Sequence, residues 1–83
     1  MDDKIIASFV MHRRNRRVDL ELPLDMTAHE LVLALNQAYE LGIRTEDLGQ
    51  CYLSCENPVA LLRGRRTLRE IGLRDGSIVH FTR

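Results

Sequence analysis

Two cysteines and three histidines are the side chains of this 83-residue sequence best suited to metal binding or redox chemistry. On one strand, Cys51 and Cys55 would have Cα atoms roughly 13 Å apart, too far for a disulfide. A zinc site at this spacing needs a loop and two further ligands, whereas His12, His29 and His80 are scattered without ligand spacing. We therefore predict buried structural cysteines, no metal and no other cofactor.

No set of residues that could perform catalysis can be assembled from the sequence. Ser8, Ser54 and Ser77 lie outside any motif that activates a nucleophile. The chain contains neither a phosphate-binding glycine loop nor a dinucleotide fingerprint. The acidic pairs at positions 2–3 and 46–47 fall in a terminus and a loop, where we expect solvated charges. The sequence thus predicts that the protein is not an enzyme.

The strongest charge feature is arginine, which makes up all but one of the 12 basic residues. Two groups stand out: Arg13, Arg14, Arg16 and Arg17, then Arg63, Arg65 and Arg66. One interpretation is a solvated loop whose charge discourages edge aggregation, and we favour it for the first group. The other is a basic surface that steers association with an acidic protein, a membrane surface or RNA. The sequence leaves open whether the two groups meet in space.

The net charge of zero hides an uneven distribution. Formal charges sum to +3 over residues 1–17, −7 over 18–62 and +4 over 63–83. A nucleic-acid-binding domain of this size usually has a basic excess, so nucleic acid is a poorly matched partner. The segregated charge favours an oppositely charged protein surface or head-to-tail self-association. A homodimer paired through the outer face of the sheet or an edge strand is a further hypothesis.

Length and hydropathy limit the architecture further. The 83 residues allow one domain, 1–83, with little room for a substrate cleft of several hundred cubic ångströms. No segment approaches the roughly 20 apolar residues of a membrane span, and the acidic start at positions 2–3 is unlike a signal peptide. We therefore expect a cytoplasmic binding module.

The chain opens with a predicted β-hairpin. Residues 4–11 alternate as a strand with apolar residues on one face, residues 12–16 form a polar turn, and residues 17–22 alternate again. Asn15 is the expected left-handed residue of the turn. Pro23 ends the second strand because it has no N–H to give to the ladder.

A single main helix follows, starting at Thr27. Thr27 and Glu30 fit a capping box, and Gly42 is the expected stop. The predicted apolar stripe consists of Leu31, Leu35, Ala38 and Tyr39. Further strands are expected at 51–55, 59–62 and 77–82, with a helical turn at 67–72 ending at glycine. The order predicts an α+β fold: a mixed four- to five-stranded sheet with one main helix packed on one face.

The sheet face away from the helix is the predicted protein-binding site. If the last strand lies between the first and third, alternation turns one set of residues outward on all three strands. An exposed apolar patch of this kind usually marks an interaction surface. The predicted patch consists of Ile6, Val10, Tyr52, Ile78 and His80.

Several segments resemble ubiquitin-like β-grasp domains. The opening hairpin leads directly into the single helix, which Gly42 and Ile43 follow as a Gly-Ile does in ubiquitin. Residues 64–68 resemble ubiquitin's Gly-Arg-Thr-Leu stretch, and residues 71–79 follow a pattern common in the superfamily. The likeness spans residues 4–82 and implies the β-grasp fold.

A closer resemblance is to the YukD/EsaB family, small bacterial ubiquitin-like proteins linked to type VII secretion. Residues 18–23 resemble the family's second strand, and residues 30–35 its apolar helix. The arginines at 13–17 depart from the family pattern. The resemblance implies an accessory or regulatory protein that binds a cytosolic domain of a secretion-system membrane component. The alternative is a nucleic-acid-binding β-grasp module with its basic turn on phosphates.

The end of the sequence bears on conjugation. Conjugated ubiquitin-like proteins and sulfur carriers end in a flexible Gly-Gly tail, because only glycine lets the backbone thread the activating enzyme's narrow channel. This sequence ends at Arg83 without that dipeptide. We therefore expect a protein that is not conjugated, unless it is made as a larger precursor.

Overall fold

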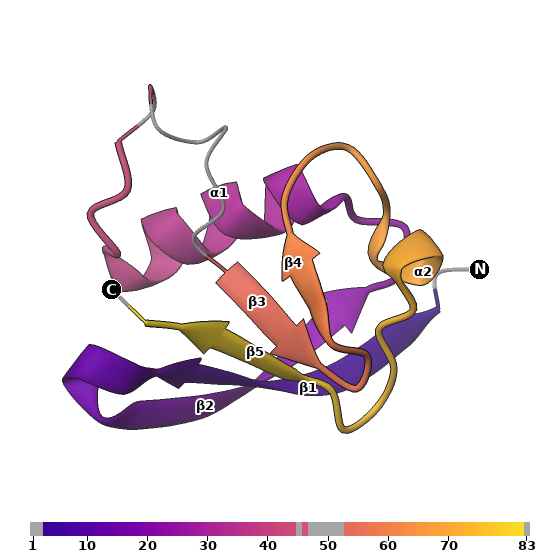
Figure 1. Ribbon diagram of the computed structural model, residues 1–83, viewed down its shortest axis with the longest axis horizontal. Helices are drawn as coiled ribbons and strands as arrows, with labels where there is room; N and C mark the ends of the chain where they lie inside the picture. Colours follow the sequence, from indigo (N-terminus) through magenta and orange to yellow (C-terminus); the bar gives the residue numbers. More distant parts are fainter. Residues whose placement is uncertain (1–2, 45, 47–52, 83) are drawn as a thin grey trace.

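The computed structural model describes residues 3–44, 46 and 53–82. The elements run in the order β1 (Lys4–Met11), η1 (His12–Arg14), β2 (Arg16–Pro23), α1 (Ala28–Tyr39), β3 (Leu53–Glu56), β4 (Ala60–Leu62), α2 (Leu68–Ile71) and β5 (Ile78–Phe81). The strands form one mixed sheet of order β2-β1-β5-β3-β4, in which β1 and β5 are parallel and the other pairs antiparallel (Figure 1). The predicted α+β architecture, with β5 between β1 and β3, is confirmed.

The opening hairpin forms where the alternating pattern predicted it. β1 and β2 pair antiparallel, with Phe9 opposite Val18 and Met11 opposite Arg16. Asn15 adopts φ 50° and ψ 47°, the predicted left-handed conformation. An asparagine tolerates this region better than most residues because its short side chain bonds locally. The turn between β1 and β2 is therefore determined by local sequence, mainly by Asn15.

Helix α1 begins as predicted but ends earlier. Both hydrogen bonds of the capping box are present, since Glu30 N donates to Thr27 Oγ1 and Thr27 N to Glu30 Oε1, each at 3.1 Å. The predicted stop at Gly42 is wrong, because Glu40 already takes the left-handed conformation at φ 51°. The carbonyls of Tyr39 and Glu40 accept hydrogen bonds from the Arg14 guanidinium, a partner that local sequence does not reveal.

The buried stripe of α1 also differs from the prediction in part. Leu31 and Leu35 are buried as expected, and Tyr39 is half-buried with its ring centroid 5.5 Å from that of Phe9. Ala38 is exposed, so its assignment to the core was wrong. Val32 takes a place in the core instead, because the buried face of α1 consists of Ala28, Leu31, Val32 and Leu35, which follow the helical spacing i, i+3, i+4 and i+7.

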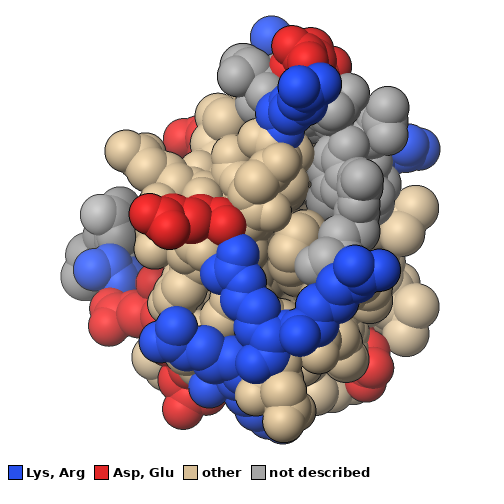
Figure 2. Space-filling model, turned by 90° about the vertical axis from the view of Figure 1, so that its left-hand side faces the viewer, with Lys and Arg blue, Asp and Glu red and all other residues tan. Residues whose placement is uncertain are grey.

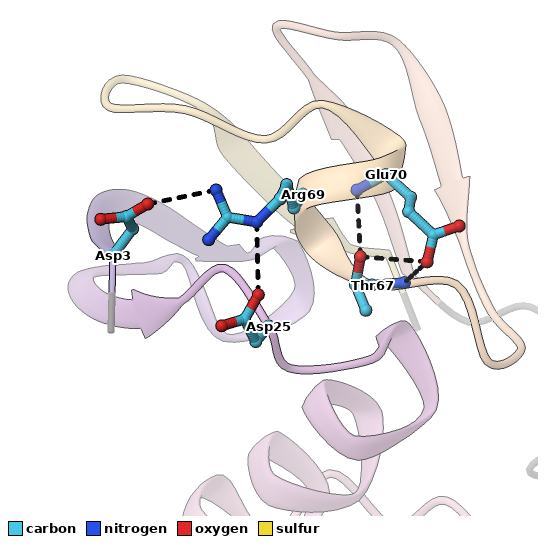
Figure 3. Close-up of polar contacts among 5 residues, drawn as sticks. All are labelled: Asp3, Asp25, Thr67, Arg69 and Glu70. Atoms are coloured by element: carbon cyan, nitrogen blue, oxygen red, sulfur yellow. Dashed lines mark hydrogen bonds and ion pairs between the residues drawn. The ribbon is translucent and has the colours of Figure 1, made fainter. Parts of the chain in front are cut away.

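The N-termini of the two helices satisfy each other's unpaired amides. Ala28 N donates to Arg66 O at 2.9 Å, and Leu68 N donates to Met26 O at 2.8 Å. Helix α2 has its own capping box, formed by Thr67 and Glu70, and ends at Gly72 as predicted (Figure 3). These amides would otherwise lack partners, because the first turn of a helix leaves its N–H groups unbonded.

Arg69 ties the first strand to this helix pair. Its guanidinium lies 3.2 Å from Asp3 Oδ2 and 3.2 Å from Asp25 Oδ1, so it bridges the segment before β1 and the segment before α1 (Figure 3). The hydrogen bonds that Arg69 donates to Asp25 and, to a smaller extent, to Asp3 raise the pKa of its guanidinium. All three side chains are substantially exposed, so the bridge defines geometry more than it adds stability.

The core lies between α1 and one face of the sheet. It contains the inward side chains of every strand and the buried face of α1, with Phe9, Met11 and Val79 fully enclosed. The predicted third strand at 51–55 is observed as Leu53–Glu56, and its first two residues lie outside the described residues. The edge strand predicted at 59–62 is confirmed as Ala60–Leu62. No helix of the described residues covers the opposite sheet face (Figure 1).

Candidate protein-binding face

The outer sheet face, as we call the face away from α1, consists of two rows of side chains that run across the strands. One row places Val10 opposite His80, His80 opposite Ser54, and Ser54 opposite Leu61. The other places Ser8 opposite Ile78, and Ile78 opposite Glu56. Neighbouring strands lie about 4.8 Å apart, so each row is a continuous line of contacts. Residues distant in the sequence thus share one surface.

The predicted patch residues that the structure describes lie together on this face. Ile6 is 50% exposed, whereas Val10, Ile78 and His80 are half-buried by their neighbours. Tyr52 lies outside the described residues. The exposed apolar surface on β1 and β5 is therefore smaller than the alternation alone implied, because only part of each half-buried side chain is accessible to a partner.

Two exposed apolar side chains near this face were missed by the sequence analysis. Leu61 is 59% exposed on the outer side of β4, and Val59 is 89% exposed just before that strand. The alternation of Leu61 with the buried Leu62 could have identified the first of them. With Ile6 they supply much of the exposed apolar surface of the described residues, whose exposed large hydrophobic side chains are Ile6, Leu33, Val59 and Leu61.

A chain of three polar side chains crosses the centre of the outer face. His12 Nε2 lies 2.8 Å from His80 Nδ1, and the two rings stack with centroids 5.0 Å apart. His80 Nε2 lies 2.9 Å from Glu56 Oε1. The sequence analysis treated the histidines as scattered, which is wrong for this pair. Parallel pairing of β1 with β5 brings them together across 68 positions, so no local signal existed.

The carboxylate end of this chain borders a hollow of about 630 Å³. The hollow lies beside β3 and β4, and His80, Glu56 and Leu61 are part of its wall. The remaining lining residues are Ser54, Cys55, Asn57, Val59 and Ala60. Among the described residues, no group of three or more His, Cys, Asp or Glu side chains is arranged to hold a metal ion. The wall of the hollow therefore combines apolar side chains with one carboxylate and one imidazole.

The first arginine group surrounds the hairpin turn, and basic side chains gather on that end of the molecule (Figure 2). Its members have different contacts. Arg14 Nη2 donates to Glu40 O at 2.6 Å, the Arg16 guanidinium lies 6.0 Å from the Tyr39 ring centroid, and Arg17 Nη2 donates to Ser8 Oγ at 3.0 Å. Arg13 has no hydrogen bond or ion pair with any described residue. Part of this group thus holds the helix end in place.

The second arginine group lies at the opposite end of α1. The loop containing Arg63, Arg65 and Arg66 crosses the helix N-terminus, where Arg66 O and Gly64 O accept hydrogen bonds from Ala28 N and His29 N. Arg14 contacts the C-terminus of the same helix. A helix of 12 residues is about 18 Å long, so the two groups do not merge into one basic surface.

Cys55 is 2% exposed and its thiol donates to Pro58 O at 3.1 Å, as expected of a structural cysteine. Burial raises the pKa of this thiol, which lowers the fraction of reactive thiolate. In a Cys51→Ser variant at pH 8, we expect Ellman's reagent to modify Cys55 at least about tenfold more slowly in the folded protein than in urea. Equal rates in both conditions would contradict this prediction. Cys51 lies outside the described residues.

Comparison with solved structures identifies the fold as a ubiquitin-like β-grasp. The ubiquitin-like domain of tubulin-binding cofactor B superposes with a TM-score of 0.74 at 16% identity, covering 96% of this chain and 89% of that one. The C-terminal ubiquitin-like domain of mouse tubulin-specific chaperone e gives 0.75 at 12% identity, with 98% and 87% coverage. A ubiquitin-like domain of an Arabidopsis thaliana protein gives 0.64 at 14% identity, with 93% and 73% coverage. At these identities the likeness concerns the fold alone.

Sequence comparison identifies the family. No curated protein sequence matches the chain significantly. None of the helices among the described residues is long and apolar enough to cross a membrane. The family model described as the WXG100 protein secretion system (Wss) protein YukD matches residues 8–81, which include part of β1, all of β2 and α1, and both residue rows of the outer sheet face described above. The resemblance in the sequence is thereby confirmed, and the chain belongs to the YukD family.

Proposed function

We propose that this protein is a non-enzymatic interaction module of the WXG100 secretion system. It docks through the outer sheet face onto a cytosolic domain of a membrane component of that system, and acts in the cytoplasm without covalent attachment to its partner. The observation that carries the proposal is the outer sheet face itself, which no helix of the described residues covers and on which Ile6 and Leu61 are at least half exposed. Exposed apolar side chains on such a face are typical of interaction sites.

The polar chain at the centre of the face gives the docking surface its specificity. His80 is 19% exposed at its side chain and already holds Glu56, so a partner must match this pair rather than simply cover it. A partner that buried the pair without satisfying its remaining donors and acceptors would lose affinity. The apolar residues of the face therefore supply contact area, and the polar chain selects the partner.

The arginine groups assist the encounter. Arg13 at the hairpin turn and the exposed residues of the second group, beside the N-terminus of α1, present positive charge at two ends of the molecule. Such charges accelerate association with an acidic surface while contributing little to the docked complex. Raising the ionic strength should therefore slow association more than it accelerates dissociation.

The docking test uses pairs of substitutions matched in charge. Ile78→Asp with His80→Asp should abolish binding of purified cytosolic domains of the secretion-system membrane components in surface plasmon resonance. Leu33→Asp with Gln37→Asp adds the same number of carboxylates on the exposed side of α1 and should leave binding unchanged. Ile6→Asp with Leu61→Asp changes only well-exposed residues of the outer face, and keeps the test valid if the first pair unfolds the domain. Binding that survives in both outer-face variants would refute the docking surface.

A further inference from the structure

The free edge of β2 is a second surface with a definite chemistry, and it borders the outer sheet face. β2 is the first strand of the order β2-β1-β5-β3-β4, so only one of its sides is paired (Figure 1). It runs for eight residues, twice the length of β3 or β5. A long unpaired edge presents a row of backbone donors and acceptors to any strand that can pair with it.

The hydrogen bonds of β1 establish which residues of β2 face this edge. Ser8 N donates to Ser77 O, and Ile6 O accepts from Gly76 N, so the even-numbered residues of β1 bond toward β5. The odd-numbered residues therefore bond to β2, where Phe9 faces Val18 and Ala7 faces Leu20. By alternation, the N–H and C=O groups of Arg17, Asp19 and Glu21 point out of the sheet edge.

The charges along this edge reverse in sign. The strand begins with Arg16 and Arg17 and continues with Asp19 and Glu21, all exposed. An antiparallel copy of the same strand brings the basic half of each strand opposite the acidic half of the other. Opposite charges directly across an antiparallel pair stabilise it by about 0.2–1 kcal/mol, and like charges destabilise it. The pattern is therefore complementary to itself.

We propose that β2 pairs antiparallel with β2 of a second copy of this chain, around a twofold axis at Val18. Arg17 then lies opposite the partner's Asp19, and Asp19 opposite the partner's Arg17. Both pairs use the outward backbone groups, and each exchanges two hydrogen bonds. Val18, half-buried on the helix side of the sheet, meets the partner's Val18 across the axis. The two sheets become one continuous sheet.

The register follows from the charges. A shift by one residue would turn every side chain to the wrong face, so only shifts of two residues need comparison. A shift of two residues in one direction puts Asp19 opposite the partner's Asp19, and a shift of two in the other direction puts Arg17 opposite the partner's Arg17. Both place like charges across from each other, whereas the register centred on Val18 has none in its central pairs. The edge contact is small, so we expect a transient dimer that dissociates on dilution.

Sedimentation velocity measures this association directly in the unmodified protein. The weight-average mass should rise from monomer toward dimer as the concentration increases. Raising the sodium chloride concentration from about 50 mM to about 500 mM should shift the transition to higher protein concentration, because exposed charge pairs are screened. A monomer mass at every concentration up to about 1 mM would overturn the proposal.

Charge exchange tests the register. Arg17→Asp alone and Asp19→Arg alone each place like charges in both central pairs, so each variant should stay monomeric where the unmodified protein dimerises. An equimolar mixture of the two variants restores opposite charges in both pairs and should dimerise again. A mixture that remains monomeric, or single variants that dimerise like the unmodified protein, would overturn the proposal. Circular dichroism of each variant confirms that it is folded. Each variant also loses one contact with Ser8 on the outer sheet face, so the readout is the mass and not partner binding.

Discussion

Replacing Phe9 by alanine is expected to lower the free energy of unfolding by about 3–5 kcal/mol. The Phe9 side chain is fully buried, and its ring packs at 53° against that of Tyr39. Its removal loses both the transfer free energy of the ring and the contacts around the cavity that remains. A domain with a total stability of about 5–15 kcal/mol would lose a large part of it.

Leu33→Ala is the matched control, because Leu33 is a large apolar residue that α1 leaves 40% exposed. Alanine has the higher helix propensity, so we expect a change of less than about 1 kcal/mol. Urea unfolding followed by circular dichroism measures both variants. Equal losses for the two would show that the core is not centred between α1 and the sheet.

Arg14→Ala should lower the free energy of unfolding by about 1–2 kcal/mol, because the guanidinium bonds the last carbonyls of α1. Those carbonyls have no partner within the helix, and the positive charge also favours the negative end of the helix dipole. Amide hydrogen exchange should accelerate in the last turn of α1. Arg14→Lys should retain part of the stability, since an ammonium group cannot reproduce the planar two-donor contact.

Arg13→Ala is the neighbouring control. This substitution removes the same charge as Arg14→Ala, but Arg13 has no hydrogen bond or ion pair with any described residue. We expect its stability to stay within about 0.5 kcal/mol of the unmodified protein. If the two alanine variants were equally stable, Arg14 would be a surface charge like its neighbour. The comparison also distinguishes the contribution of an arginine to stability from its contribution to the rate of association. Only Arg13→Ala should change the association rate without changing the stability of the domain.

Several elements were predictable because their causes lie within a few residues. The period-two pattern of residues 4–11 and 17–22 specified the hairpin, and Asn15 specified its left-handed turn. Thr27 with Glu30 specified the start of α1 through hydrogen bonds that span three positions. Cys55 was assigned to the core from alternation with Leu53.

The end of α1 illustrates where such reasoning fails. Gly42 is a suitable stop by composition, but the helix ends at Tyr39 because Arg14 reaches its carbonyls from the hairpin turn, 25 and 26 positions away. Ala38 likewise fits an ideal periodic stripe but is exposed, while Val32 is buried. Which side of a helix is buried depends on how the helix rests on the sheet, and that is a property of the packed core.

The sequence by itself determined the order of elements, the β-grasp resemblance and the family, since these depend on local pattern and on residues along the whole chain. Only the tertiary structure decided that His12 joins His80 and Glu56. It also placed the two arginine groups at opposite ends of α1 and left one edge of β2 unpaired among the described residues. The physical reason is that strands distant in sequence pair through backbone bonds, which carry no side-chain signal. Their side chains become neighbours only when the sheet has formed.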